Sequence, residues 1–278
     1  MARVILEPGI WLIIVNNTRA FNALSSAIIA ELVADFEAVC ADPATRVVIF
    51  RGVEVEGKYL APLAGADLKD LVDISDPENP QPVENGNAHL LEGACAIHNI
   101  RRFCRRGSTF NPKDPGHVLV LGMVDGPCLA GGMEFMFGLS DLVLATPRSK
   151  FGMREILLGG MGGWCGPETL RKILCSPMWI KEMLLAAGDQ KSGDIDAATA
   201  MARGLVNRLY HEDNILEATN ELAQHLASLD PYAVTCNLAA AEFDWSRDCT
   251  NDTISWMTNL MMGDAWVRNV SAFLAGQR

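Results

Sequence analysis

The stretch that most constrains this chain runs from Val118 to Ala145. Its first part, Val118 to Val124, is an apolar run with strand character that ends in Asp-Gly-Pro, and apolar residues at helical spacing follow a turn of small residues. Such a turn leaves backbone N–H groups unpaired at a helix start, and its glycines let a ligand approach them. These groups suit an anion or an oxyanion. Glu134 comes three residues after Gly131, in the first turn of the predicted helix. We therefore expect its carboxylate to lie close to any ligand oxygen that these N–H groups polarise, where it is a candidate acid or base.

The residues at the helix start, Gly131-Gly132-Met133-Glu134, and the Asp-x-x-x-Ala pattern of 141–145 resemble the crotonase (enoyl-CoA hydratase/isomerase) superfamily. Two further pieces fit in the same order, 63–69 upstream and 151–159 downstream. The resemblance covers roughly residues 3 to 210. It implies an α/β fold with a crotonase-like ββα spiral core and the active site in residues 1–210, and a C-terminal helical trimerisation appendage in residues 211–278.

Composition narrows the function classes. The chain has 278 residues, a formal net charge of −11 and eight scattered cysteines without a C-x-x-C pair. An acidic surface argues against nucleic acid as a partner, because phosphate-backbone binding needs basic groups. The cysteine pattern favours free thiols in a reducing compartment. The apolar runs are too short to cross a bilayer, so we expect a cytoplasmic protein with no membrane contact.

Patterning along the chain predicts the main elements. We expect a hairpin over 3–15 with its turn at Pro8-Gly9, a helix after Ser25-Ser26, and a buried strand over 46–51. We then expect a loop over 73–87, a helix over 88–103, and an insertion over 103–116 before the central strand. Further helices are predicted over 167–174, 179–187 and 194–203, a short strand over 205–209, and only helices from 214 to 275.

Two glutamates are the candidate catalytic residues. Adding water to a conjugated thioester needs a base for the water and an acid for the α-carbon. In the family, residues matching Glu134 and Glu155 do this in hydratases, and isomerases often keep only the second. The alternative interpretation is that Glu134 only complements a helix N-terminus and that Glu155 is a solvated loop residue.

The resemblance also implies an oxyanion pair, the backbone N–H groups of Ala66 and Gly131, which would stabilise an enolate. The alternative is an ordinary strand-to-helix turn at Ala66. The remaining substrate or coenzyme A contacts are expected at Asn22, Ala23, Leu24, Ala64, Asp67, Leu68 and Phe273. Asn22 to Leu24 and Phe273 match positions near the adenine in the family, although the familiar lysine near the C-terminus is absent.

Several positions depart from the family pattern. Met153-Arg154 stands where hydratases commonly have Gln-Pro, and Arg154 either lowers the pKa of Glu155 or points to solvent. Gly162 replaces a proline in the glycine-rich run 159–166, which lacks the context of a dinucleotide site. The basic cluster Arg101, Arg102, Arg105 and Arg106 is either a solvated helix end or a contact for coenzyme A phosphates. The histidines lack metal-ligand spacing, so no metal site is expected.

These observations favour a hydratase-like lyase acting on an acyl-CoA thioester through an enolate. No bound cofactor is expected, since the coenzyme A thioester is the substrate, and the family implies a homotrimer or a dimer of trimers. Isomerisation, decarboxylation and hydrolysis of a cyclic β-diketone use the same enolate stabilisation and stay open. A non-catalytic binding or scaffold subunit and a nucleotide-dependent oxidoreductase are the alternatives from other classes.

Overall fold

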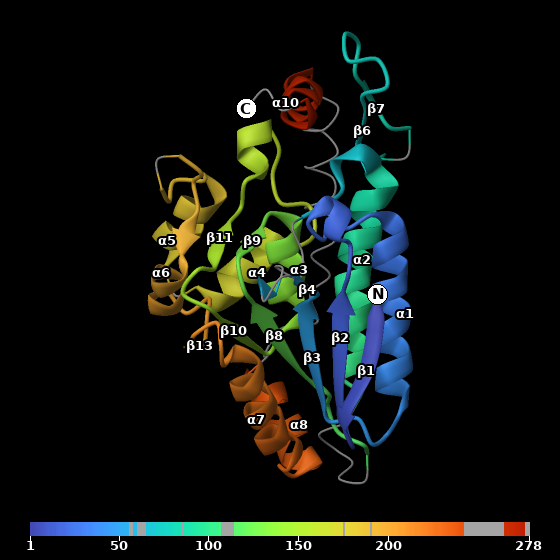
Figure 1. The fold of residues 1–278 in the computed structure, drawn as a ribbon, viewed down its shortest axis with the longest axis vertical. Coiled ribbons are helices and arrows are strands. Elements are labelled where there is room, and N and C mark those ends of the chain that lie inside the picture. The colour runs from blue at the N-terminus through green and yellow to red at the C-terminus, as the bar shows by residue number, and fades with distance from the viewer. Residues whose placement is uncertain are drawn as a thin grey trace.

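The computed structural model describes residues 1–55, 58–59, 65–84, 86–106, 114–174, 176–189, 191–241 and 264–275. Ala64 and the middle of the 103–116 insertion lie outside these ranges. The fold is a mixed α/β arrangement built on a mostly parallel sheet (Figure 1). None of the helices in the described part of the chain combines the length and apolar character needed to span a bilayer.

The central sheet has six strands in the order β1-β2-β3-β8-β10-β13. Strands β1 (Ala2–Glu7) and β2 (Ile10–Val15) form the predicted antiparallel hairpin, and every later pairing in this sheet is parallel. The others are β3 (Val47–Gly52), β8 (Leu119–Val124), β10 (Leu142–Ala145) and β13 (Arg208–Leu209). The predicted strand over 205–209 is therefore shorter than expected.

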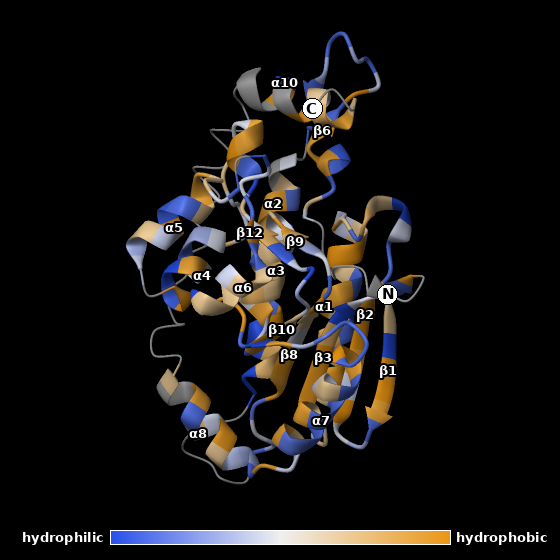
Figure 2. Cartoon of the chain, turned by 60° about the vertical axis from the view of Figure 1, so that its left-hand side comes forward, coloured by the Kyte–Doolittle hydropathy of each residue, from blue (hydrophilic) through white to orange (hydrophobic). Residues whose placement is uncertain are grey.

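Both faces of this sheet are covered. Along β3, Val48 and Phe50 belong to the main core, while the alternate residues Val47 and Ile49 belong to a second core on the opposite face. Strands buried on both faces become continuously apolar, as the colouring of β2 and β3 shows (Figure 2). This double burial explains why the sequence signal for β3 and β8 is a run rather than an alternation.

Two long helices pack side by side against the main core, α1 (Ser26–Ala41) and α2 (Gly86–Cys104). As predicted, Ser25 caps α1, with its hydroxyl accepting from the N–H of Ile28. The buried helix α3 (Gly131–Leu139) connects β8 to β10. Further along lie α4 (Gly166–Ile173), α5 (Pro177–Leu184) and α6 (Ala197–Ala202).

Two predicted segments differ in the structure. The helix expected over 194–203 begins only at Ala197, because Ile195 pairs with Phe151 as part of β12 (Ile195–Asp196), and Asp196 then caps α6. The loop expected over 73–87 contains a short antiparallel ladder between β6 (Val72–Asp73) and β7 (Gln81–Pro82). A second small ladder joins β4 (Glu54–Val55) to β5 (Lys58–Tyr59).

The C-terminal helices lie at two ends of the molecule. Helices α7 (Ile215–Ala227) and α8 (Pro231–Ala241) are at one end, where α7 contacts β2, β3, β8 and β10, and α10 (Asp264–Leu274) is at the other (Figure 1). Val267 and Val270 of α10 pack with Leu71 and Leu90. The domain boundary at residue 210 and the trimer-forming role stay predictions.

Three arginines of the basic cluster, Arg101, Arg105 and Arg106, are held by hydrogen bonds within the fold, whereas Arg102 is exposed, as expected of a solvated helix end. Arg101 and Arg105 both donate to the carboxylate of Asp141, which also accepts from the N–H of Val120 at 2.7 Å. Arg106 donates to backbone carbonyls near the end of α1, including those of Asp42 and Thr45. These bonds connect α1 and α2 to the start of β10. The guanidinium groups of Arg101, Arg105 and Arg106 are therefore engaged within the fold, which argues against the predicted alternative of contact with coenzyme A phosphates.

Candidate active site

The site forms where two parallel strands end at the same edge. Strand β9 (Pro127–Leu129) pairs in parallel with β11 (Lys150–Gly152), so that Leu129 lies opposite Gly152. The segment after β9 leads through Ala130 into α3, and the segment after β11 leads into the short helix η3 (Glu155–Leu158). This topology brings Glu134 and Glu155 toward one volume, although twenty residues of sequence separate them.

A third segment brings Ala66 to the start of α3. Ala66 forms a parallel bridge with Leu24, in which the Gly65 carbonyl accepts from Leu24 and the Asp67 N–H donates to Leu24. The N–H of Ala66 therefore points away from Leu24. It lies 3.3 Å from the position that a Cβ on Gly131 would occupy. The two backbone groups predicted as oxyanion donors are thus close together.

The N–H of Gly131 is available for a ligand because of its helix position. Gly131 is the first residue of α3, where backbone N–H groups have no acceptor within the helix. The preceding Ala130 has φ 51°, an uncommon conformation for a residue with a side chain. Its carbonyl accepts from the N–H groups of Met133 and Glu134. This turn fixes the direction of the first N–H groups of α3.

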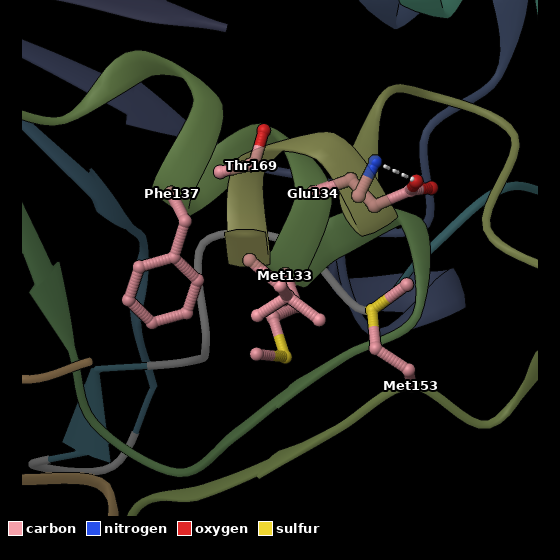
Figure 3. Close-up of a pocket in the computed structure, with 7 residues that line it drawn as sticks. Met133, Glu134, Phe137, Met153 and Thr169 are labelled. Atoms are coloured by element: carbon pink, nitrogen blue, oxygen red, sulfur yellow. Dashed lines mark hydrogen bonds between the residues drawn. The ribbon is translucent and has the colours of Figure 1, made fainter. Parts of the chain in front are cut away.

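Glu134 is buried and held by the glycine-rich run. Its Oε1 accepts from the N–H of Gly166 at 2.6 Å (Figure 3). The same oxygen accepts from the N–H of Trp164 at 3.0 Å. A Cβ on Gly162 would lie 2.8 Å from the same oxygen, which explains why this position is glycine. The run 159–166 therefore wraps the carboxylate of Glu134, a role that the sequence did not reveal.

Glu155 is held differently. Both of its carboxyl oxygens are buried and have no hydrogen-bond partner among the described residues. Burial raises the pKa of Glu155 to about 7. Burial, and next the charge of Glu155, raise the pKa of Glu134, against the two backbone hydrogen bonds. The two carboxyl groups thus interact electrostatically, and at neutral pH they resist ionising together.

Arg154 is not among the groups that shift the pKa of Glu155, and its side chain, although 37% exposed, is held by an ion pair and is not free in solvent. Its guanidinium forms a two-pronged ion pair with the buried carboxylate of Asp194, with Nε 2.8 Å from Oδ1. Asp194 lies directly before β12, the edge strand of the small sheet β12-β11-β9. The pair fixes the backbone on which Glu155 is carried.

The other residues predicted to contact the substrate differ in their local surroundings. Asp67 caps the short helix η2 (Leu68–Asp70), with its side chain accepting from the N–H of Lys69. Leu68 packs against the apolar cluster that includes Val267 and Val270 of α10. Asn22 is buried and has φ 61°. Ala23 accepts from the side chain of Asn17. Phe273 is 51% exposed on α10. Their roles in substrate binding stay predictions.

A small pocket lies beside Glu134. It leaves no room for a water-sized molecule, so it is a gap in the packing and not a ligand pocket of ordinary size. Its lining, seen in part in Figure 3, consists of Met133, Glu134, Phe137, Met153, Gly166, Thr169 and Leu170. Among the described residues, no group of acidic, histidine or cysteine side chains is placed to hold a metal ion. The geometry offers two backbone donors and two carboxyl groups to one small carbonyl compound.

Comparison with known proteins places this geometry in context. A family model described as enoyl-CoA hydratase/isomerase matches residues 115–251. A probable enoyl-CoA hydratase of Rhizobium meliloti is 28% identical over 229 residues, which cover 80% of this chain and 73% of the relative. The 2,3-dehydroadipyl-CoA hydratase of Escherichia coli is 27% identical over 230 residues, 82% of this chain and 76% of that protein.

Solved structures show the same fold at lower identity. An enoyl-CoA hydratase of Mycobacterium avium subsp. paratuberculosis superposes with a TM-score of 0.73 at 18% identity, over 98% of this chain and 97% of that one. A methylmalonyl-CoA decarboxylase superposes with a TM-score of 0.73 at 21% identity, over 99% of this chain and 95% of that one. At these identities the structural likeness describes the fold alone.

Proposed function

We propose that the chain is a member of the crotonase (enoyl-CoA hydratase/isomerase) superfamily and a lyase that adds water to the double bond of an enoyl-CoA thioester. The observation that carries this proposal is the meeting of four groups at one strand edge. These are the N–H groups of Ala66 and Gly131 and the carboxyl groups of Glu134 and Glu155.

The two N–H groups would bind the thioester oxygen. As the oxygen of the attacking water bonds to the β-carbon, negative charge moves to the thioester oxygen and an enolate forms. Fixed donors stabilise that charge more than the neutral thioester, and each donor typically contributes about 10²–10³ in rate. The buried position of α3 keeps water from screening this interaction.

The two glutamates would manage the protons. One ionised carboxylate takes a proton from the attacking water, and the other carboxyl group donates a proton to the α-carbon. Since the charge of Glu155 disfavours ionisation of Glu134, the pair is suited to holding a single proton near neutral pH. One base and one acid are then available at the same time without a metal ion.

The test measures binding and product together. The purified protein is titrated with coenzyme A and with crotonyl-CoA in an isothermal calorimeter. The mass of the acyl-CoA recovered from the same samples is then measured by mass spectrometry. We expect binding and a product heavier by one water, with formation greatly slowed in Glu134→Ala. Binding without added water would point to isomerisation, decarboxylation or a scaffold role, and absence of any binding would contradict an acyl-CoA substrate.

The oligomeric state is part of the same proposal. We expect a trimer or a dimer of trimers, and light scattering of the purified protein measures it directly.

A further inference from the structure

Two buried polar atoms beside the proposed oxyanion donors have no partner among the described residues, Nε2 of His89 and Nε1 of Trp164. His89 is 2% exposed and Trp164 is 1% exposed. The rings meet edge to face with their centroids 5.4 Å apart. Because an unpaired buried polar group is costly, two such groups together indicate a place where a polar ligand atom binds.

The indole of Trp164 connects this place to the reaction centre. A Cβ on Gly131 would lie 2.5 Å from Cζ3 of the indole, so the six-membered ring borders the Gly131 donor. At the other edge, a Cβ on Gly93 of α2 would lie 2.1 Å from Nε1. Trp164 therefore extends from the oxyanion donors to the face of α2 that carries His89.

The partners of His89 are known on one side of its ring only. Nδ1 is 3.1 Å from Oγ of Ser26, and 3.8 Å and 4.0 Å from carboxylate oxygens of Asp70 and Glu92. Asp70 is held in turn by the N–H of Ser26. This arrangement fixes the ring and leaves Nε2 for a ligand.

We propose that His89 and Trp164 form a subsite for a neutral hydroxyl group on the acyl chain of the substrate. This inference rests on the proposed function. A hydroxyl oxygen accepts from the indole N–H, and the hydroxyl group either accepts from or donates to Nε2, so it suits both neutral tautomers of His89. A carboxylate is disfavoured by the charges near His89, which come from Asp67, Asp70 and Glu92.

A pair of isosteric substrates tests this. trans-5-Hydroxypent-2-enoyl-CoA and trans-hex-2-enoyl-CoA differ only by a terminal hydroxyl in place of a methyl group, and the shorter pair 4-hydroxybut-2-enoyl-CoA and pent-2-enoyl-CoA moves the hydroxyl by one carbon. We expect kcat/KM for the hydroxylated member of at least one pair to exceed that of its partner at least tenfold. A site built to bond a hydroxyl is left with unpaired groups when a methyl replaces it.

Variants locate the preference. His89→Leu and Trp164→Phe should each reduce the ratio of the two kcat/KM values at least tenfold, because each removes one polar atom. His98→Leu is the matched control, since His98 is an exposed histidine of the same helix, and the ratio should stay as in the wild type. Circular dichroism and the melting temperature show whether each variant folds.

The outcomes separate the two proposals. Turnover of both members of each pair at equal kcat/KM would overturn the hydroxyl subsite and leave the hydratase proposal standing. A preference that survives in both variants would also overturn the subsite. Turnover of none of the four compounds would overturn the hydratase proposal, and the subsite with it.

Discussion

Trp164 lies against Gly131 so closely that no side chain fits between them. A Cβ on Gly131 would be 2.5 Å from the buried indole, while the N–H of Ala66 is 3.3 Å from the same point. The contact with Trp164 explains why this position is glycine. The proposed function adds a second reason, because the thioester oxygen would have to approach the N–H group of Gly131.

Gly131→Ala should therefore damage both activity and stability. The added methyl group would push the N–H of residue 131 out of place, and we expect kcat/KM to fall by about 10²–10³, the contribution of one oxyanion donor. Overpacking should lower the free energy of unfolding by about 1–3 kcal/mol. Urea unfolding and steady-state kinetics measure the two effects.

The double variant Gly131→Ala, Trp164→Leu is the control for this prediction. The smaller side chain makes room for the methyl group, so part of the overpacking should be relieved relative to Trp164→Leu alone. If Gly131→Ala costs as much stability in the Trp164→Leu background as in the wild type, the contact with the indole is not the cause.

The burial of Glu155 makes stability depend on pH. Its pKa is about 7 in the folded protein and near 4.5 when unfolded, so between these values the folded state holds a proton that the unfolded state has lost. Stability should therefore fall as pH rises from about 4.5 to 7, by up to about 3 kcal/mol, and this contribution should then level off.

Glu155→Gln removes this titration. We expect the variant to be more stable than the wild type at pH 8, and the difference between the two proteins to shrink toward pH 5. Urea unfolding at both pH values gives the free energies. A difference that is the same at pH 5 and pH 8 would show that the folded protein does not raise the pKa of Glu155.

The ion pair between Arg154 and Asp194 should matter more than a surface pair. The carboxylate of Asp194 is 1% exposed, so Arg154→Ala would leave a buried charge without its partner. Because the Arg154 side chain is itself 37% exposed, we expect a loss of about 1–3 kcal/mol in the free energy of unfolding. Activity should fall as well, since Arg154 directly precedes Glu155.

Arg171→Ala provides the comparison. Arg171 is 67% exposed and lies 3.8 Å from Glu168, and exposed pairs contribute about 0–1 kcal/mol. Equal losses in the two variants would contradict the account of Asp194 as a buried anion that needs Arg154.

Local patterns in the sequence predicted most of the fold. Pro8-Gly9 and Ser25 act through neighbouring residues, so the hairpin and the cap of α1 could be recognised directly. The ladder between β6 and β7 and the late start of α6 depend on partners distant in sequence. Ile195, for example, is extended because it pairs with Phe151.

The site was predicted in the same uneven way. The motifs around Gly131 and Ala66 indicated segments that the structure brings together, whereas the partners of Arg154 and Arg105 are buried aspartates 40 and 36 residues away. The wrapping of Glu134 by the run 159–166 was also missed. The only sequence signal for this contact was the run of closely spaced glycines after Glu155. Such a run indicates that the backbone approaches another group closely, but it does not identify that group as the carboxylate of Glu134.

The most direct test of the central claim measures whether Glu134 and Glu155 act as one unit. Hydration of crotonyl-CoA is followed for the wild type, Glu134→Gln, Glu155→Gln and the double variant. Each single change should lower kcat by about 10²–10⁴, and the double variant should be close to the worse single variant. Single variants that hydrate crotonyl-CoA at the wild-type rate, or losses that multiply in the double variant, would contradict a shared acid–base pair.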